Sequence, residues 1–239
     1  MSRRRIPAAL LFSVALSPFA QAADVAIDIG HTLEKPGAIS AAGVTEHTFN
    51  QQLAGQLGRH LQAAGLSVRW INRDGKVTSL YQRTALAASD RLFVSIHHDS
   101  VKAKYRPVRD NRFQGFSFWP SETGTEPARS LDCARSMADQ LLADGFTPSR
   151  YHADPVLGEN RPVLDGPRGI FSNRSLAVLR TARQAAVLVE AGVIAHPEEE
   201  QRLADPATQD RIAIALAQGI VTCLGSPALQ TARTAPDQR

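Results

Sequence analysis

Four side chains of this sequence have the types and the placement that a hydrolytic metal site needs. His31, His97 and Glu190 each end or directly follow a short apolar run, and Glu46 opens a run with helical periodicity. Two imidazoles and a carboxylate are the ligand set of a catalytic zinc ion, which keeps a fourth position for water. A further carboxylate beside that water can serve as its base. The pattern therefore indicates a candidate zinc site, although a strand-end histidine can simply be hydrogen-bonded and Glu46 can simply complement a helix dipole.

The elements that would position these residues follow from the periodicity of the apolar side chains. Short runs rich in β-branched residues alternate with helical patterns, which is typical of βαβ units and a mainly parallel sheet. Strands are expected at 25–29, 66–71, 92–97, 116–119, 176–179 and 186–190, and helices at 46–64, 79–88, 127–143 and 206–224. Such sheets bind ligands at the carboxyl edge of their strands. We therefore predict one α/β domain, with a mainly parallel central sheet flanked by helices and the zinc site at the carboxyl edge of the strands.

One segment fits neither periodic pattern. Residues 147–169 contain four prolines and three glycines, so we expect a long loop there. Long loops in compact domains are usually functional, and this one offers little apolar area to bury. We interpret it as a rim or lid that shapes substrate access.

The first 22 residues have the composition of a secretory signal peptide. Three arginines precede an apolar run at 8–16, and Ala20-Gln21-Ala22 provides small residues for cleavage. The apolar run is shorter than the roughly 20 residues that span a bilayer. We therefore expect an exported, periplasmic protein with no membrane span after cleavage. Its divisions would be a signal peptide at 1–22, a catalytic domain at 23–225 and a flexible tail at 226–239.

Loss of the signal segment nearly neutralises the chain. The full sequence has 27 basic and 23 acidic residues, and three of the basic ones lie in that segment, which leaves a net charge of about +1. The remainder shows no cluster of Lys and Arg, and no basic helical face, of the kind that nucleic acids require. We predict no nucleic-acid partner.

The two cysteines, Cys133 and Cys223, lie in expected helices and have no second Cys or His at zinc-site spacing. After export, a disulfide between them could form and persist. The sequence favours two separate buried thiols, with a bridge as the alternative.

Four blocks in one order give the chain a resemblance to a known family. They are Ile27-Asp28-Ile29-Gly30-His31 with Pro36-Gly37-Ala38, then Glu46 with Asn50, then Ser95-Ile96-His97, and finally Val187-Leu188-Val189-Glu190 with His196-Pro197-Glu198-Glu199. They span about residues 24–225 and resemble the zinc-dependent N-acetylmuramoyl-L-alanine amidases of type 3, bacterial enzymes that remove peptide stems from peptidoglycan. Two residues depart from the family's first block, because Ile29 replaces a Pro and Thr32 replaces a Gly. The turn around His31 is therefore expected to differ.

The resemblance implies a function and a role for each site residue. His31, Glu46 and His97 would hold Zn²⁺, which polarises the amide carbonyl and lowers the pKa of its water. Glu190 would take the proton of that water and return it to the departing amine. The bond cleaved would join N-acetylmuramic acid to L-alanine in peptidoglycan or in muropeptides. The sequence identifies no protein activator.

The same resemblance gives neighbouring polar residues supporting roles. His47 and His98 are each adjacent to a proposed ligand, Glu46 and His97, and because neighbours on a strand face opposite ways, only one residue of each pair can coordinate. His47, His98 and His152 are expected in solvent, at the rim or behind the ligands, and Asp28 and Asp99 as acceptors that orient ligands. The alternative functions are another zinc amide or peptide hydrolase on a related fold, and a catalytically inactive wall-binding module.

Overall fold

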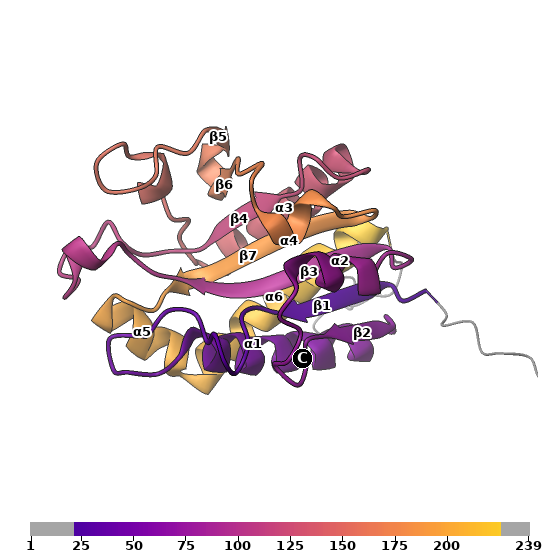
Figure 1. The fold of residues 1–239 in the computed structure, drawn as a ribbon, viewed down its shortest axis with the longest axis horizontal. Helices are drawn as coiled ribbons and strands as arrows, with labels where there is room; N and C mark the ends of the chain where they lie inside the picture. Colours follow the sequence, from indigo (N-terminus) through magenta and orange to yellow (C-terminus); the bar gives the residue numbers. More distant parts are fainter. Residues whose placement is uncertain (1–21, 226–239) are drawn as a thin grey trace, which may run out of the picture.

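The computed structural model describes residues 22–225, and its frame is a sheet of seven strands (Figure 1). The strands are β1 (Val25–Ile29), β2 (Val68–Ile71), β3 (Leu92–Asp99), β4 (Ser117–Pro120), β5 (Val163–Asp165), β6 (Ile170–Phe171) and β7 (Ala185–Val193). They lie in the order β2-β1-β3-β7-β4-β6-β5. The three apolar runs that lead to His31, His97 and Glu190 are therefore neighbours in the sheet.

The direction of the strands changes after β7. β1 pairs in parallel with β2 and with β3, and β3 pairs in parallel with β7. β4 runs antiparallel to β7 but parallel to β6, and β5 runs antiparallel to β6. The predicted α/β fold with a mainly parallel sheet is confirmed, and the antiparallel pairs are an addition. Because β1, β3 and β7 are parallel, their carboxyl ends meet at one edge.

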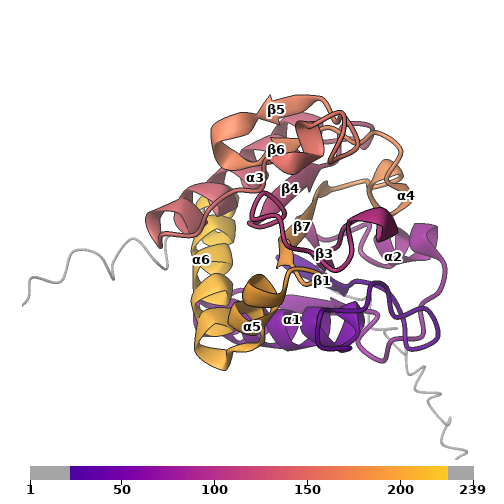
Figure 2. The same cartoon turned by 90° about the vertical axis from the view of Figure 1, so that its left-hand side faces the viewer.

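Helices cover both faces of this sheet (Figure 2). The long helices α1 (Glu46–Ala63), α3 (Pro127–Ala143) and α6 (Pro206–Leu224) pack on one face, and the short helices α2 (Leu80–Leu86) and α4 (Ala177–Arg180) lie on the other. Alternate strand residues point to opposite faces, so Ile27 of β1 joins the core under the long helices and Ala26 joins the core under the short ones. A strand covered on both faces has a continuous apolar sequence, which is why these strands could be located.

The two cysteines meet where α3 packs on α6. Gly219 of α6 lies so close to α3 that a Cβ atom there would come within 2.4 Å of the Cα of Met137. This close approach brings Cys133 and Cys223 together as a disulfide with Cα atoms 5.0 Å apart. The interpretation as two separate thiols is therefore wrong, because the spacing of two helices is a tertiary property that neither local sequence contains.

Several short elements differ from the expectation. Residues 176–179, expected as a strand, are mostly in helix α4, whose Val178 and Leu179 join the core under the short helices. An apolar run of four residues fits a strand and a helix equally well. Helix α5 (Pro197–Ala204) and strands β5 and β6 were not predicted.

The expected signal peptide, apart from its last residue, and the expected tail lie outside the described residues. Within residues 22–225, no helix combines the length and the apolar character needed to cross a bilayer.

Candidate metal centre and catalytic carboxyl

Glu46 lies between two histidines at the edge of the sheet where β1 and β3 end. Its Oε2 is 2.9 Å from Nε2 of His31, and its Oε1 is 3.0 Å from Nδ1 of His97. The side chain of Glu46 is 6% exposed, that of His97 15% and that of His31 32%, so the cluster is most open on the side of His31. The structure thus brings together the three residues that the resemblance implies as ligands.

The donor set and its spacing fit a zinc ion. Zinc binds nitrogen and oxygen at about 2.0–2.2 Å in a tetrahedron, so its ligand atoms lie roughly 3.3 Å from one another. In His31, Glu46 and His97, one candidate ligand atom per residue lies within 4.8 Å of the others, a spacing that small side-chain rotations would close. Burial acts to raise the pKa of Glu46, but the hydrogen bonds with His31 and His97 outweigh it, and the pKa lies below its usual range. The cluster could therefore hold a metal ion through an ionised carboxylate.

His31 reaches the cluster through an unusual backbone conformation. Its φ of 66° is in the left-handed region, which residues with a side chain rarely adopt. Its carbonyl oxygen accepts hydrogen bonds of 2.6 Å from Asn72 Nδ2 and from Arg83 Nη2. Arg83 is a buried residue of α2 and pairs with Asp28 at 3.1 Å. Asp28, expected to orient a ligand directly, therefore acts on the backbone of His31 through Arg83.

Two glycines leave room for the ligand side chains. A Cβ atom on Gly30 would come within 2.5 Å of the His97 ring. A Cβ atom on Gly37, where φ is 80°, would come within 2.5 Å of Glu46 Oε2 and 2.6 Å of the His31 ring. Both glycines stand in the sequence blocks of the resemblance, and this crowding is the physical reason for them.

His47 and His98 lie outside the cluster and support it. His47 Nδ1 is 2.8 Å from the carbonyl oxygen of Gly30. His98 Nδ1 is 2.8 Å from Asn50 Oδ1, and Asn50 Nδ2 donates to Glu46 Oε1 at 3.3 Å. Both rings are buried, and burial lowers the pKa of His98 to about 4, so this imidazole is neutral. Both histidines therefore lie behind the ligands rather than in solvent or at the rim.

Glu190 lies on β7 beside the cluster. Its register partners are His97 on β3 and Ser117 on β4, so the three side chains share one face of the sheet. Its Oε2 is buried without a hydrogen-bond partner among the described residues. Burial raises the pKa of Glu190 well above its usual value, and the negative charges of Asp99 and Glu46 raise it further. A carboxyl group whose pKa is raised in this way can hold a proton and release it during a reaction.

A buried imidazolium, which the sequence did not reveal, lies next to the same face. His152 Nε2 is 2.9 Å from Asp99 Oδ2, and His152 Nδ1 is 3.1 Å from Glu159 Oε2. Burial acts to lower the pKa of His152, but the hydrogen bonds with these two carboxylates outweigh it and raise the pKa to about 9. Nε2 also lies 3.4 Å from the hydroxyl of Ser117, the strand neighbour of Glu190. Asp99, expected to orient a ligand, instead binds His152.

The segment 147–169 that carries His152 is more structured than a rim loop. It contains the short helical turns Tyr151–Ala153 and Gly166–Arg168 as well as β5. Tyr151 is 4% exposed, packs on Phe113 with ring centroids 5.0 Å apart and hydrogen-bonds Asp99 through its hydroxyl group. The expectation that this segment buries little apolar area is wrong for its first part, and its influence on substrate access stays a prediction.

An α/β sheet with a ligand cluster and a proton-holding carboxyl at its carboxyl edge defines the class of a metal-dependent hydrolase. Residues 25–222 match the sequence family described as N-acetylmuramoyl-L-alanine amidase. The chain is 26% identical over 223 residues to the amidase AmiA of Escherichia coli K12, which covers 83% of this chain and 75% of AmiA. It is 25% identical over 229 residues to the amidase AmiC of Neisseria meningitidis, covering 86% of this chain but only about half, 54%, of AmiC.

The fold agrees with these sequence matches. The catalytic domain of CwlV, an N-acetylmuramoyl-L-alanine amidase from Bacillus (Paenibacillus) polymyxa var. colistinus, superposes with a TM-score of 0.66 at 26% identity, covering 84% of this chain and 97% of that one. The chain therefore belongs to the N-acetylmuramoyl-L-alanine amidase family. The resemblance carried by the four sequence blocks is confirmed, and with it the reaction class, hydrolysis of the amide bond between N-acetylmuramic acid and L-alanine.

Proposed function

We propose that this chain is an exported, zinc-dependent amidase that releases stem peptides from peptidoglycan or its fragments. The observation that carries the proposal is the placement of His31, Glu46 and His97 within ligand distance of one another, with Glu190 at the adjacent strand position. Two imidazoles and one carboxylate are the ligands expected for a hydrolytic zinc ion rather than for Mg²⁺ or Ca²⁺, which prefer oxygen ligands.

The chain's own residues divide the reaction between them. His31, Glu46 and His97 would hold the Zn²⁺. When bound, this ion would polarise the scissile carbonyl and lower the pKa of a water molecule. Glu190 accepts a proton from the attacking water and later delivers it to the nitrogen of the departing L-alanine, which leaves as a neutral amine. The unpaired Oε2 and the raised pKa of Glu190 suit both steps, because the group must bind the proton and then release it.

Export is supported by two features of the chain. The arginines, apolar run and small residues at 1–22 have the order of a signal peptide. The bond between Cys133 and Cys223 is of a kind that persists in oxidising compartments such as the periplasm.

The proposal is tested with purified protein from which residues 1–22 have been removed. Elemental analysis should find one zinc per chain, and mass spectrometry of digested sacculi should find peptides that begin with L-alanine beside glycan strands with intact lactyl groups. Cleavage inside the peptide would instead indicate another zinc peptide hydrolase. Binding to sacculi without any product would indicate an inactive wall-binding module.

A further inference from the structure

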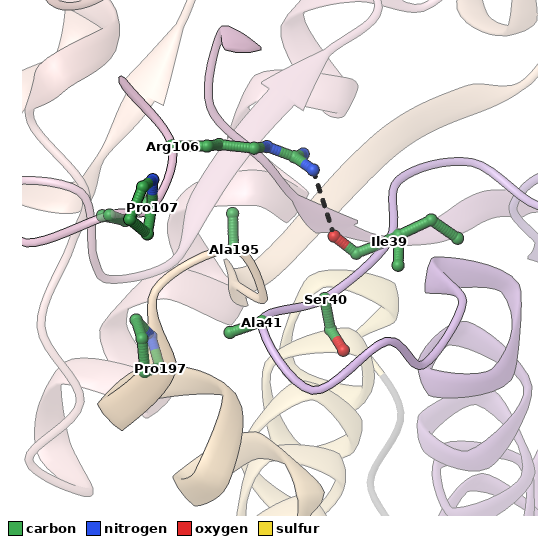
Figure 3. A pocket seen from close by; sticks show the side chains of 8 residues that line it. Ile39, Ser40, Ala41, Arg106, Pro107, Ala195 and Pro197 are labelled. Carbon is green, nitrogen blue, oxygen red and sulfur yellow. Dashed lines mark hydrogen bonds between the residues drawn. The ribbon is translucent and has the colours of Figure 1, made fainter. Parts of the chain in front are cut away.

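A pocket of about 410 Å³ lies at the carboxyl edge of the sheet, beyond the metal cluster (Figure 3). The described residues that line it are Ile39, Ser40, Ala41, Arg106, Pro107, Val108, Ala195 and Pro197. Most of this lining is apolar and small, and Arg106 alone among these residues is charged. Figure 3 shows its guanidinium group reaching across toward the carbonyl oxygen of Ile39.

Each wall of the pocket continues from an element of the proposed active site. Ile39 directly follows Ala38, whose N–H donates to Glu46 Oε2 at 3.1 Å. Arg106 lies in the segment after β3, the strand of His97, and Ala195 follows β7, the strand of Glu190. Consecutive Cα atoms are about 3.8 Å apart. Ile39, which lines the pocket, is therefore only one residue away from Ala38, which contacts the proposed ligand Glu46.

The wall at 39–41 is held in place by buried contacts. Ser40 Oγ donates to Glu200 Oε1 at 2.5 Å, and the N–H of Ala42 donates to Glu200 Oε2 at 2.9 Å. The N–H of Ala41 donates to the carbonyl oxygen of Ile194 at 3.0 Å. Glu200 belongs to α5, so this helix supports the wall of the pocket, a role that its sequence did not reveal. The wall is preformed, which lowers the entropic cost of binding a ligand there.

The opposite wall presents a cation. Val108 is 4% exposed and packs in a buried cluster with Ala195, which fixes the chain next to Arg106. The guanidinium donates to the carbonyl oxygen of Ile39 at 3.3 Å and to the hydroxyl of Ser100. A guanidinium has more N–H donors than these two bonds use, and its planar fork matches a carboxylate.

We propose that this pocket receives the peptide that follows the scissile amide and that Arg106 binds a carboxylate of that peptide. The occupant is thus an acidic peptide whose small aliphatic part contacts Ala41 and Ala195. A carboxylate on the residue after L-alanine lies roughly 7 Å from the scissile bond, a reach of two residues. Arg106 is then a specificity-determining residue for acidic stems. This inference rests on the proposed function, because it assumes that the scissile bond lies at the metal cluster.

The test compares two substrates that differ only in charge. They are N-acetylmuramoyl-L-alanyl-D-glutamate and the same compound with both carboxylates converted to amides. Arg106→Gln should lower kcat/KM for the acidic substrate about tenfold, the scale of one charge-assisted hydrogen bond, mainly through KM. It should lower kcat/KM for the amidated substrate by a clearly smaller factor, so that the preference for the acidic substrate falls. Arg106→Lys should keep part of the preference.

Arg109→Gln is the matched control. Arg109 is exposed in the same segment, does not line the pocket and makes no ion pair in the described part of the chain. Arg109→Gln should leave kcat/KM for both substrates unchanged. An equal effect of Arg106→Gln on both substrates, or a wild-type enzyme without preference, would overturn the proposal.

Failure of the proposed function is recognised separately. A wild-type protein that cleaves neither substrate contradicts the amidase proposal, and the pocket is then tested by calorimetry with L-alanyl-D-glutamate. Tighter binding of this dipeptide than of its diamide, lost in Arg106→Gln, supports the carboxylate site. Equal binding of both, or binding of neither, refutes it.

Discussion

Replacing Glu190 by Gln should greatly reduce turnover and leave the fold and the zinc site intact. No hydrogen bond or ion pair among residues 22–225 depends on the buried Oε2 of Glu190. An amide in its place would leave one polar atom unpaired, at a cost of about 1–3 kcal/mol, but the carboxyl group already carries that cost. The net change in the free energy of unfolding should therefore be below about 1 kcal/mol. For a domain of this size, that is a shift in Tm of roughly 2–4 °C or less.

The effect on turnover should be far larger. A positioned general base contributes about 10² to 10⁴-fold, and Gln cannot accept the proton of the attacking water. We expect Glu190→Gln to retain zinc, to melt near the wild-type temperature and to release stem peptides from sacculi at least about a hundredfold more slowly. The control is Glu198→Gln, which removes the same charge from an exposed position on α5. Retained zinc with near wild-type release would refute the base assignment, whereas loss of zinc would make Glu190 a metal ligand.

His31→Ala and His97→Ala should each abolish stoichiometric zinc, and elemental analysis showing unchanged metal in both would reject these ligands. The pKa of His152 is about 9 in the folded protein, above the roughly 6.5 of an unfolded histidine. Its contribution to the free energy of unfolding is therefore complete below pH 6.5 and is lost as the pH rises through 9. The loss is on the order of 3 kcal/mol. Between pH 6 and pH 10, the Tm of His152→Gln should therefore fall less steeply than that of the wild type. Parallel curves for the two proteins would contradict the buried imidazolium. Thiol titration of denatured, unreduced protein should find neither Cys133 nor Cys223 free, and two titratable thiols would disprove the bridge.

The parts of the fold that the sequence predicted are those with a strong local signal. β1, β3 and β7 are buried on both faces, so their apolar runs stand out and lead directly to the ligands and to Glu190. Helices α3 and α6 begin at the predicted residues because Pro127 and Pro206 occupy first-turn positions, and α6 ends before Gly225 in the left-handed conformation.

The parts that the sequence missed depend on contacts between distant segments. His152 looks like a loop histidine until Asp99, 53 positions earlier in the chain, is brought to its ring. The role of Glu200 depends on Ser40, which lies 160 positions earlier. The antiparallel direction of β4 is likewise set by how the chain returns to β7, and its own four residues carry no sign of it.

The contacts of Arg83 make metal affinity partly a property of a helix that supplies no ligand. From α2, this guanidinium binds the carbonyl oxygens of Ile29 at 2.9 Å and of His31 at 2.6 Å, and so maintains the left-handed backbone that aims the His31 imidazole. By thermodynamic linkage, whatever favours this backbone favours metal binding, and a bound metal in turn favours the docked helix by the same free energy. Metal binding and the docking of α2 are then coupled equilibria. Metal depletion should therefore loosen α2, a helix that supplies no ligand but contacts the backbone of His31 through Arg83.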